Sequence, residues 1–212
     1  MKALICIPCI DRDHDIQSNV YQSIHCPIEF SILVALRKRD VKCYEFWKDK
    51  AAIITLPDYE IAERHNWEMM CHTFNILKMC FDMSDFDVMT IVESDIILNK
   101  DTLSKHYRSV HQYDVVLSYY DVPWAGEPVI VKGDFPFTFV SKTVKEPGER
   151  VLGSGTGCTT LKRGNRASFQ LGEVHGIEGQ DVGFFIDCYK KGHSVFMVND
   201  HLDHLYNRKK NE

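Results

Sequence analysis

The first 119 residues alternate between short apolar runs and segments with helical periodicity. Short apolar runs are typical of buried strands, and apolar side chains at three- and four-residue steps are typical of helices. The pattern predicts strands at residues 3–7, 30–36, 88–92 and 114–119, and helices at 16–24, 59–81 and 102–110. This order predicts the α/β class, with a mostly parallel sheet that is covered by helices on both faces.

After residue 119, prolines and glycines punctuate short β-rich pieces. The patterns predict strands at 128–131 and 135–140, a helix at 181–190 and a last strand at 194–198. The chain has 212 residues and no repeat, low-complexity tract or obvious linker, so we expect one domain that spans residues 1–212. The polar, basic tail is either a frayed end or the start of a connection to further domains.

Charge and hydropathy exclude several classes of protein. The sequence has 30 acidic and 25 basic residues, a net charge of -5 and an ordinary share of apolar residues. This balance argues against a disordered chain and against broad electrostatic binding of nucleic acid. No apolar run approaches the roughly 18 residues of a membrane-spanning helix, and the N-terminus lacks the pattern of a secretory signal. We therefore expect a cytoplasmic protein with no membrane span.

The eight cysteines are scattered through apolar segments, which favours free, buried thiols over disulfides. Cys6 and Cys9 form a C-x-x-C pair. A structural zinc site would need a second pair of similar spacing, which the sequence does not contain. A thioredoxin-like redox pair remains an alternative, although Cys6 falls inside an apolar run and would face the sheet.

A pair of carboxylates follows the predicted strand 88–92. Glu93 and Asp95 come directly after its apolar run and before the apolar residues 96–98. Open α/β sheets bind ligands at the carboxyl ends of their strands, and buried carboxylates need a countercharge. We therefore predict that this pair binds Mg²⁺ or Mn²⁺, which would in turn bridge to a diphosphate. The alternative is a solvated turn whose acids cap the next segment.

Asp181 is a second candidate, at the start of the predicted helix 181–190. A carboxylate there can accept the proton of an attacking hydroxyl, but an acid at this place is also an ordinary helix N-cap. His201 and His204 follow the last predicted strand and are candidates to complete a metal site. The alternative for either histidine is a surface position without a role.

Glycines gather at residues 153–157. A dinucleotide-binding fingerprint does not fit, because Cys158 occupies the third glycine position, and no Gly-Lys-Ser/Thr follows as a Walker A loop requires. Glycines beside a strand would let a substrate approach the backbone closely, or would form a bulge.

Taken in order, these segments resemble the GT-A glycosyltransferases, a family that uses nucleotide sugars. The resemblance covers roughly residues 3–206. It implies a Rossmann-like GT-A fold in which residues 1–119 bind the nucleotide and residues 120–212 form a smaller, β-rich acceptor side. The first strand and the residues after it resemble the family's base-binding segment, and residues 61–66 are similar to its Ala-Arg-Asn helix start. Nucleotide contacts are thereby implied for Pro8, Ile10, Asp11, Arg64 and Asn66.

The same resemblance implies a metal site. Glu93-Ser94-Asp95 looks like the metal-binding D-x-D motif of the family, with Glu in the first place. Asp95 and Glu93 are thereby implied as metal ligands, and Glu93 and Ser94 as nucleotide contacts. His204 matches the family's late metal ligand better than His201 does, by its distance from the last strand.

Gln180-Asp181 resembles a Glu-Asp pair whose Asp is the base in inverting members, with Gln in place of the first acid. The glycine segment resembles the strand beside the acceptor, which implies acceptor contacts for Gly155, Thr156 and Gly157. The activity implied is a Mn²⁺- or Mg²⁺-dependent, inverting transfer of a sugar from a UDP-sugar to a hydroxyl of a glycan or glycoprotein. The chain is also similar to glycosyltransferase domains of large DNA viruses that decorate capsid protein. The alternatives are a nucleotide-binding module without transferase activity and the thiol oxidoreductase.

Overall fold

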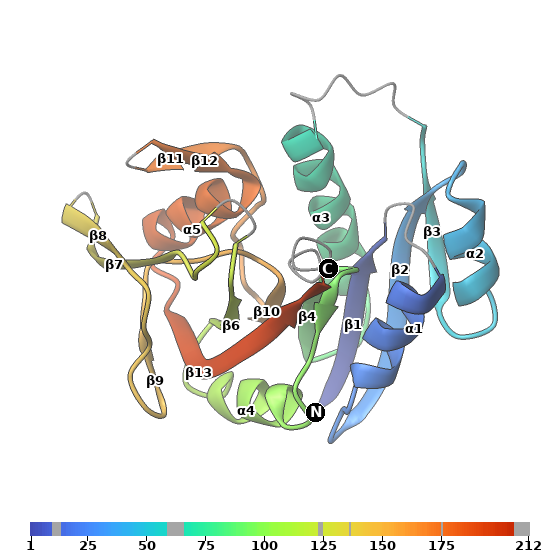
Figure 1. Cartoon of the computed structure of the whole chain (residues 1–212), viewed down its shortest axis with the longest axis horizontal. Coiled ribbons are helices and arrows are strands. Elements are labelled where there is room, and N and C mark those ends of the chain that lie inside the picture. The colour runs from blue at the N-terminus through green and yellow to red at the C-terminus, as the bar shows by residue number, and fades with distance from the viewer. Residues whose placement is uncertain (10–13, 59–65, 123–124, 136, 175, 206–212) are drawn as a thin grey trace.

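The computed structural model describes residues 1–9, 14–58, 66–122, 125–135, 137–174 and 176–205. The strands of its central sheet are β1 (Lys2–Pro8), β2 (Glu29–Arg37), β3 (Ala52–Leu56), β4 (Val88–Val92), β5 (Ile96–Ile97), β6 (Val115–Tyr120), β9 (Gly148–Arg150), β10 (Cys158–Lys162) and β13 (Val195–His204). Within the described residues these nine strands follow the order β3-β2-β1-β4-β10-β6-β13-β5, and β9 pairs with β13 (Figure 1).

The long strands of this sheet are mostly parallel, as the alternation of strands and helices predicts. Strands β3, β2, β1 and β4 are parallel to one another, and so are β6 and β13. Strand β10 lies antiparallel between β4 and β6 and joins these two parallel blocks. Because Cys158 pairs with Val92, the start of β10 lies beside the carboxyl end of β4.

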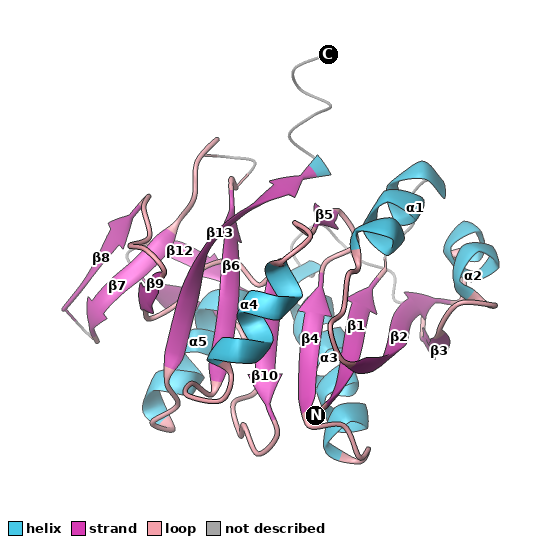
Figure 2. Cartoon of the chain, turned by 90° about the horizontal axis from the view of Figure 1, so that it is seen from below, coloured by secondary structure: helices cyan, strands magenta, loops and turns pink. Residues whose placement is uncertain are grey.

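Helices cover both faces of the sheet (Figure 2), which confirms the α/β prediction. They are α1 (His14–Ser23), α2 (Val41–Trp47), α3 (Asn66–Asp82), α4 (Thr102–Ser109) and α5 (Gln180–Lys190). Side chains alternate along a strand, so Ala3, Ile5 and Ile7 of β1 face one core while Leu4 and Cys6 face the other. The first core contains side chains of α1, α2 and α4, and the second contains side chains of α3 and α5.

Some element boundaries differ from those predicted from sequence. Helix α3 begins at Asn66 in the described part of the chain, and residues 59–65 of the predicted helix lie outside that part. Helix α2 and strand β3 have no counterpart among the predicted elements. The last strand was expected to end at residue 198, but β13 continues to His204 because its final residues pair with β5.

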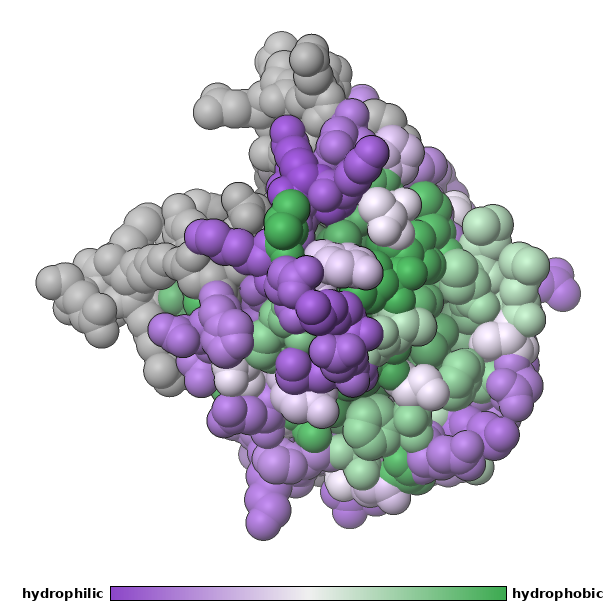
Figure 3. Space-filling model, turned by 90° about the vertical axis from the view of Figure 1, so that its right-hand side faces the viewer, coloured by the Kyte–Doolittle hydropathy of each residue, from purple (hydrophilic) through white to green (hydrophobic). Residues whose placement is uncertain are grey.

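The hairpins β7 (Ile130–Asp134) with β8 (Phe137–Ser141), and β11 (Gly172–Val174) with β12 (Ile177–Gly179), stand off the central sheet. On the opposite side of the molecule, where α2 and the edge strand β3 lie, Figure 3 shows a broad apolar area bordered by polar side chains. None of the described helices has the length and apolar character needed to span a membrane.

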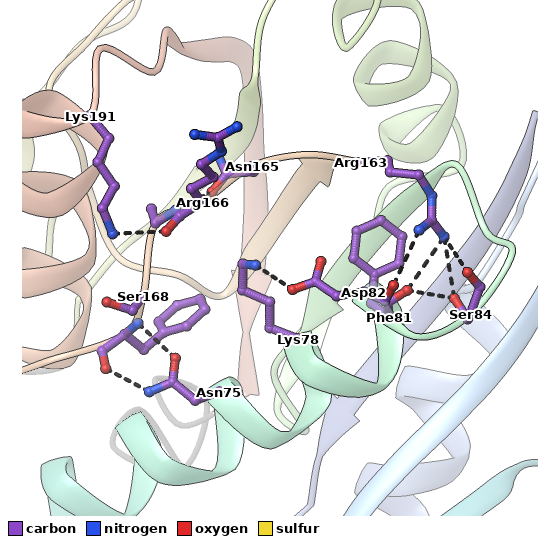
Figure 4. Close-up of polar contacts among 12 residues, drawn as sticks. Asn75, Lys78, Phe81, Asp82, Ser84, Arg163, Asn165, Arg166, Ser168 and Lys191 are labelled. Atoms are coloured by element: carbon purple, nitrogen blue, oxygen red, sulfur yellow. Dashed lines mark hydrogen bonds and ion pairs between the residues drawn. The ribbon is translucent and has the colours of Figure 1, made fainter.

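The segment between β10 and β11 is bound to α3 (Figure 4). The side-chain amide of Asn75 donates a hydrogen bond to the Phe169 carbonyl (2.8 Å) and accepts one from the Phe169 amide (3.0 Å). The Arg163 guanidinium donates to the carbonyls of Ser84 (2.9 Å) and Phe86 (2.6 Å), just beyond the end of α3. These contacts fix a segment of residues 120–212 on a helix of residues 1–119.

A buried polar network ties β13 to α4 and β6. The Asp200 carboxylate accepts hydrogen bonds from Thr102 (2.6 Å), Lys105 (2.9 Å) and Ser118 (3.2 Å). Burial by itself would raise the pKa of Asp200, but the hydrogen bonds from Thr102, Lys105 and Asn99 outweigh it. The pKa of Asp200 therefore lies below its ordinary value, and the carboxylate stays ionised at neutral pH.

Candidate active site

Glu93 and Asp95 directly follow β4, at the carboxyl edge of the sheet. The Glu93 amide donates a hydrogen bond to the Gly157 carbonyl (2.9 Å), and the Thr156 hydroxyl donates to the Glu93 carboxylate (2.9 Å). Ser94 and Asp95 are 6% and 7% exposed. A buried turn that is bonded to the neighbouring strand differs from the solvated turn of the alternative interpretation.

Strand β13 brings His204 to Asp95. The Nε2 atom of His204 lies 3.5 Å from Oδ2 of Asp95, and the Leu205 amide donates to the Asp95 carbonyl (2.9 Å). His201 is three residues earlier on the same strand and therefore points to the other face, where it is exposed and contacts Asp121 (2.9 Å). The structure thus places His204, and not His201, beside the predicted metal ligand.

Asp181 lies in the first turn of α5, whose N-cap position is occupied by Gly179. The interpretation of Asp181 as an N-cap is therefore wrong, because the helix begins one residue earlier than predicted. Its Oδ1 atom accepts a hydrogen bond from the adjacent Val182 amide (2.9 Å). Burial raises the pKa of Asp181, against the opposing effect of backbone hydrogen bonds. A carboxylate with a raised pKa is a stronger proton acceptor than one in water.

Tyr120, the last residue of β6, belongs to the same site but is absent from the residues predicted from sequence. Its ring is tilted against the His204 ring, with 5.2 Å between the centroids. Burial, followed by the negative charges of Glu93, Asp181 and Asp95, raises the pKa of Tyr120 well above its ordinary value, so the phenol stays neutral. The sequence could have indicated Tyr120 as a site residue, because it directly follows the predicted strand 114–119 and ligands bind at the carboxyl ends of parallel strands.

Gly155 and Gly157 leave room for the Tyr120 ring. A Cβ atom on either glycine would overlap that ring, and a Cβ atom on Gly153 would overlap the Phe185 ring. The segment therefore needs glycine for close packing of the protein's own aromatic side chains. This packing gives the three glycines a structural role, and the expectation that the segment contacts a substrate stays a prediction.

A cavity of about 270 Å³, here called the site cavity, opens among these elements. Glu93, Asp181 and His204 line it, together with Tyr120 and Gly155. Further lining residues come from the hairpins β7–β8 and β11–β12 and from α5. The structure thus brings to one cavity three residues that are far apart in the sequence and were predicted as base or metal ligands.

The floor of the site cavity is acidic. Burial, followed by the charge of Asp95, raises the pKa of Glu93 to about 7. A divalent cation would reduce the repulsion between the carboxylates of Glu93 and Asp95. The Asp95 carboxylate and the His204 imidazole, which lie 3.5 Å apart, are ligand types that suit Mn²⁺. No group of three or more His, Cys, Asp or Glu side chains in the described part of the chain has the arrangement of a metal site. Glu93, Asp95 and His204 thus do not form a three-ligand metal site in this part of the chain, and metal binding stays a prediction.

The structure describes some of the residues expected at the nucleotide. Outside the described residues lie Ile10, Asp11, Arg64 and the side chain of Asn66. Pro8 ends β1 and lines a hollow of about 10 Å³ with Arg37 and Thr73, among others. Because β1 and β4 are parallel neighbours, Pro8 and Ser94 lie at the carboxyl ends of adjacent strands.

All eight cysteines are free thiols, as predicted. Cys6 and Cys9 belong to the cores on opposite faces of the sheet, because they are three residues apart on an extended segment. The neighbour of Cys9 is Cys43, with 3.1 Å between the sulfur atoms. The C-x-x-C pair is therefore not assembled, which removes the basis for a thioredoxin-like function.

No family model and no curated protein matches the sequence. Solved structures share its fold. S. aureus TarS 1–349 is 14% identical, with a TM-score of 0.55, over 94% of this chain and 60% of that one, so this chain spans less than two thirds of it. The same fragment in complex with UDP-GlcNAc is 14% identical, with a TM-score of 0.54, over 97% of this chain and 61% of that one. CMP:2-keto-3-deoxy-manno-octonic acid synthetase complexed with CTP is 13% identical, with a TM-score of 0.56, over 95% of this chain and 90% of that one. The chain thus shares the Rossmann-like α/β fold of these structures.

Proposed function

We propose that this protein is a metal-dependent glycosyltransferase that moves a sugar from a UDP-sugar to a hydroxyl of a glycan or glycoprotein, with inversion at the sugar carbon. The observation that carries the proposal is the convergence of Glu93, Asp181 and His204 on one cavity, with Asp95 beside His204. It is supported by a fold shared with a protein whose structure contains UDP-GlcNAc. Residues 1–119 would bind the nucleotide, and residues 120–212 the acceptor.

Asp95 and His204 are the residues that would hold Mn²⁺ or Mg²⁺, with Glu93 as a further candidate ligand. When bound, the cation stabilises the negative charge that develops on the departing diphosphate. The hydrogen bond from Thr156 fixes the Glu93 carboxylate, and Pro8 and Ser94 lie where the nucleotide would contact the strand ends.

Asp181 would act as the base. Its carboxylate accepts the proton of the acceptor hydroxyl while that oxygen forms a bond to C1 of the sugar. The bond between C1 and the diphosphate oxygen breaks, and its electron pair leaves with UDP. Attack from the side opposite the leaving group inverts the configuration at C1. The raised pKa of Asp181 suits this proton transfer.

UDP release from a panel of UDP-sugars, measured with Mn²⁺ and with a chelator, tests the proposal, and GDP-sugars serve as a nucleotide control. We expect release that depends on metal, falls strongly in Asp181→Asn and persists in Glu178→Gln, a matched acid that also lines the cavity. Tight UDP binding without release would instead identify a nucleotide-binding module. Retained configuration in the product, seen by NMR, would remove the role of Asp181 as base.

A further inference from the structure

The upper walls of the site cavity are apolar. Val131 of β7, together with Phe185 and Ile186 of α5, contributes to these walls. Phe135 and Tyr189 also line the cavity and are 39% and 43% exposed, so they form its outer part. Their rings lie 5.6 Å apart, between centroids. The acidic residues and these apolar, partly aromatic side chains thus line the same cavity.

The charged groups of the site cavity have one sign. Among the described lining residues, the acids are Glu93, Glu178 and Asp181, the histidine is His204, and lysine and arginine do not occur. A metal ion held at Asp95 would be engaged by the diphosphate of the donor. A carboxylate or phosphate on the acceptor would thus face acids and no lysine or arginine of the described lining, which is costly where water is partly excluded.

The volume of the site cavity limits what can enter. The cavity volume of about 270 Å³ lies near the low end of the roughly 300–1,000 Å³ of small-molecule sites. It therefore suits a small ligand group rather than the whole of a long oligosaccharide. Apolar and aromatic walls bind the apolar face of a ring, with a few polar groups fixing its orientation.

We propose that the acceptor is an uncharged hydroxyl compound that places an apolar group, such as an alkyl or aryl aglycone, against this wall. The inference rests on the proposed function and adds the chemical class of the acceptor. The hydroxyl would face Asp181 on the floor, and the apolar group would contact Val131, Ile186 and Tyr189. Burial of one small apolar group favours binding by about 1.5–3 kcal/mol, which is roughly a tenfold to hundredfold gain in affinity.

Three acceptors with the same ring configuration test this inference: phenyl glucoside, methyl glucoside and phenyl glucuronide, in which C6 is a carboxylate. With the donor that gives the fastest UDP release, we expect the KM of phenyl glucoside to be at least tenfold below that of methyl glucoside. We also expect kcat/KM of the glucuronide to be at least tenfold below that of phenyl glucoside. Equal KM values for the two glucosides, or equal use of the glucuronide, would overturn the inference.

Two isosteric variants distinguish an effect on acceptor binding at the cavity wall from an effect on folding. Val131→Thr adds a hydroxyl to the wall, and Val140→Thr makes the same change at its cross-strand partner, which is exposed and does not line the cavity. We expect Val131→Thr to raise the KM of phenyl glucoside several-fold, and Val140→Thr to leave both this KM and the rate of UDP release unchanged. An unchanged KM in Val131→Thr would contradict the inference. Loss of all metal-dependent UDP release in the wild type would instead defeat the proposed function itself.

Discussion

Residues 1–119 and residues 120–212 use glycine differently: all 12 glycines of the chain lie in the second segment. The first segment forms strands and helices in alternation, a regular backbone that does not require left-handed conformations. In the second segment, Gly133 and Gly176 have positive φ in or beside the hairpins, and Gly153, Gly155 and Gly157 admit aromatic rings. Residues 1–119 thus form regular elements of the sheet without glycine. Residues 120–212 need glycine for the turns and the close aromatic packing beside the site cavity.

The candidate reacting groups are divided between the same two segments. Glu93 and Asp95 follow strand β4 in residues 1–119. Asp181 and His204 belong to α5 and β13 in residues 120–212. If the first segment binds the nucleotide and the second carries out the transfer, substitutions in the two segments should have separable effects.

Asp181→Asn should lower the rate of sugar transfer by about a thousandfold, because removal of a positioned base typically costs 10²–10⁴-fold. Binding of UDP should stay within about twofold of wild type, because Asp181 is assigned to the acceptor hydroxyl and not to the nucleotide or the metal. Stopped-time transfer assays and calorimetric UDP titration measure the two effects. If the variant lost UDP binding to the same extent as sugar transfer, nucleotide binding and transfer would not be divided between the two segments.

Asp95→Asn should weaken Mn²⁺-dependent binding of UDP by at least about tenfold, as expected when an interaction at a metal site is removed. Titration of UDP with Mn²⁺, and again with a chelator, measures the change. With the chelator, wild type and variant should bind UDP alike, because the substitution removes a ligand of the metal and leaves the β4 edge intact. A tenfold loss that persists with the chelator would place the role of Asp95 in folding or direct nucleotide contact.

Asn75→Ala should lower the free energy of unfolding by about 1–2 kcal/mol, because it leaves the Phe169 amide and carbonyl without their hydrogen bonds. Asp82→Ala at the end of the same helix is the control. It removes an ion pair with Lys78 from the side of the exposed carboxylate, whose side chain is 45% exposed, and should cost less than about 0.5 kcal/mol. Urea unfolding gives both values. Equal effects would mean that the Asn75 contact does not fasten the two segments together.

Asp200→Asn should show a stability deficit that depends on pH. The folded-state pKa of Asp200 lies below its unfolded value of about 3.9, so the carboxylate stabilises the fold above that pH and ceases to do so as the pH falls through the folded pKa. The gap between wild type and variant in urea midpoint should therefore narrow from about pH 6 to about pH 3. A gap that stays constant would mean that the charge of Asp200 contributes nothing, and that packing alone explains the deficit.

Several elements could be predicted because their signals are local. Strand β4 matches the apolar run 88–92, bounded by Asp87 and Glu93, and α5 matches its predicted range to within one residue. Strand β3 was missed although its sequence is apolar and rich in β-branched residues. The full length of β13 was not predictable from the same signals, because its last residues are polar and are held by pairing with β5.

The site was partly predictable for the same reason. The position of Glu93 and Asp95 after an apolar run indicates a sheet edge, and the fold places them there. The choice of His204 over His201 depends on how far β13 extends, since alternation along a strand decides which histidine faces Asp95. Tyr120 becomes part of the site through the insertion of β10, which carries Gly155 and Gly157 ahead of it.

The sequence by itself determined the α/β class, the position of most strands and helices, and the place of the acidic pair at a strand end. These follow from periodicity and from the residues that bound each run, which act over a few neighbours along the chain. The tertiary structure decided which acids and which histidine meet, what fills the space beside the glycines, and that a cavity forms there. Residues 93, 120, 181 and 204 come together through strand order and pairing, and these depend on packing across the whole sheet.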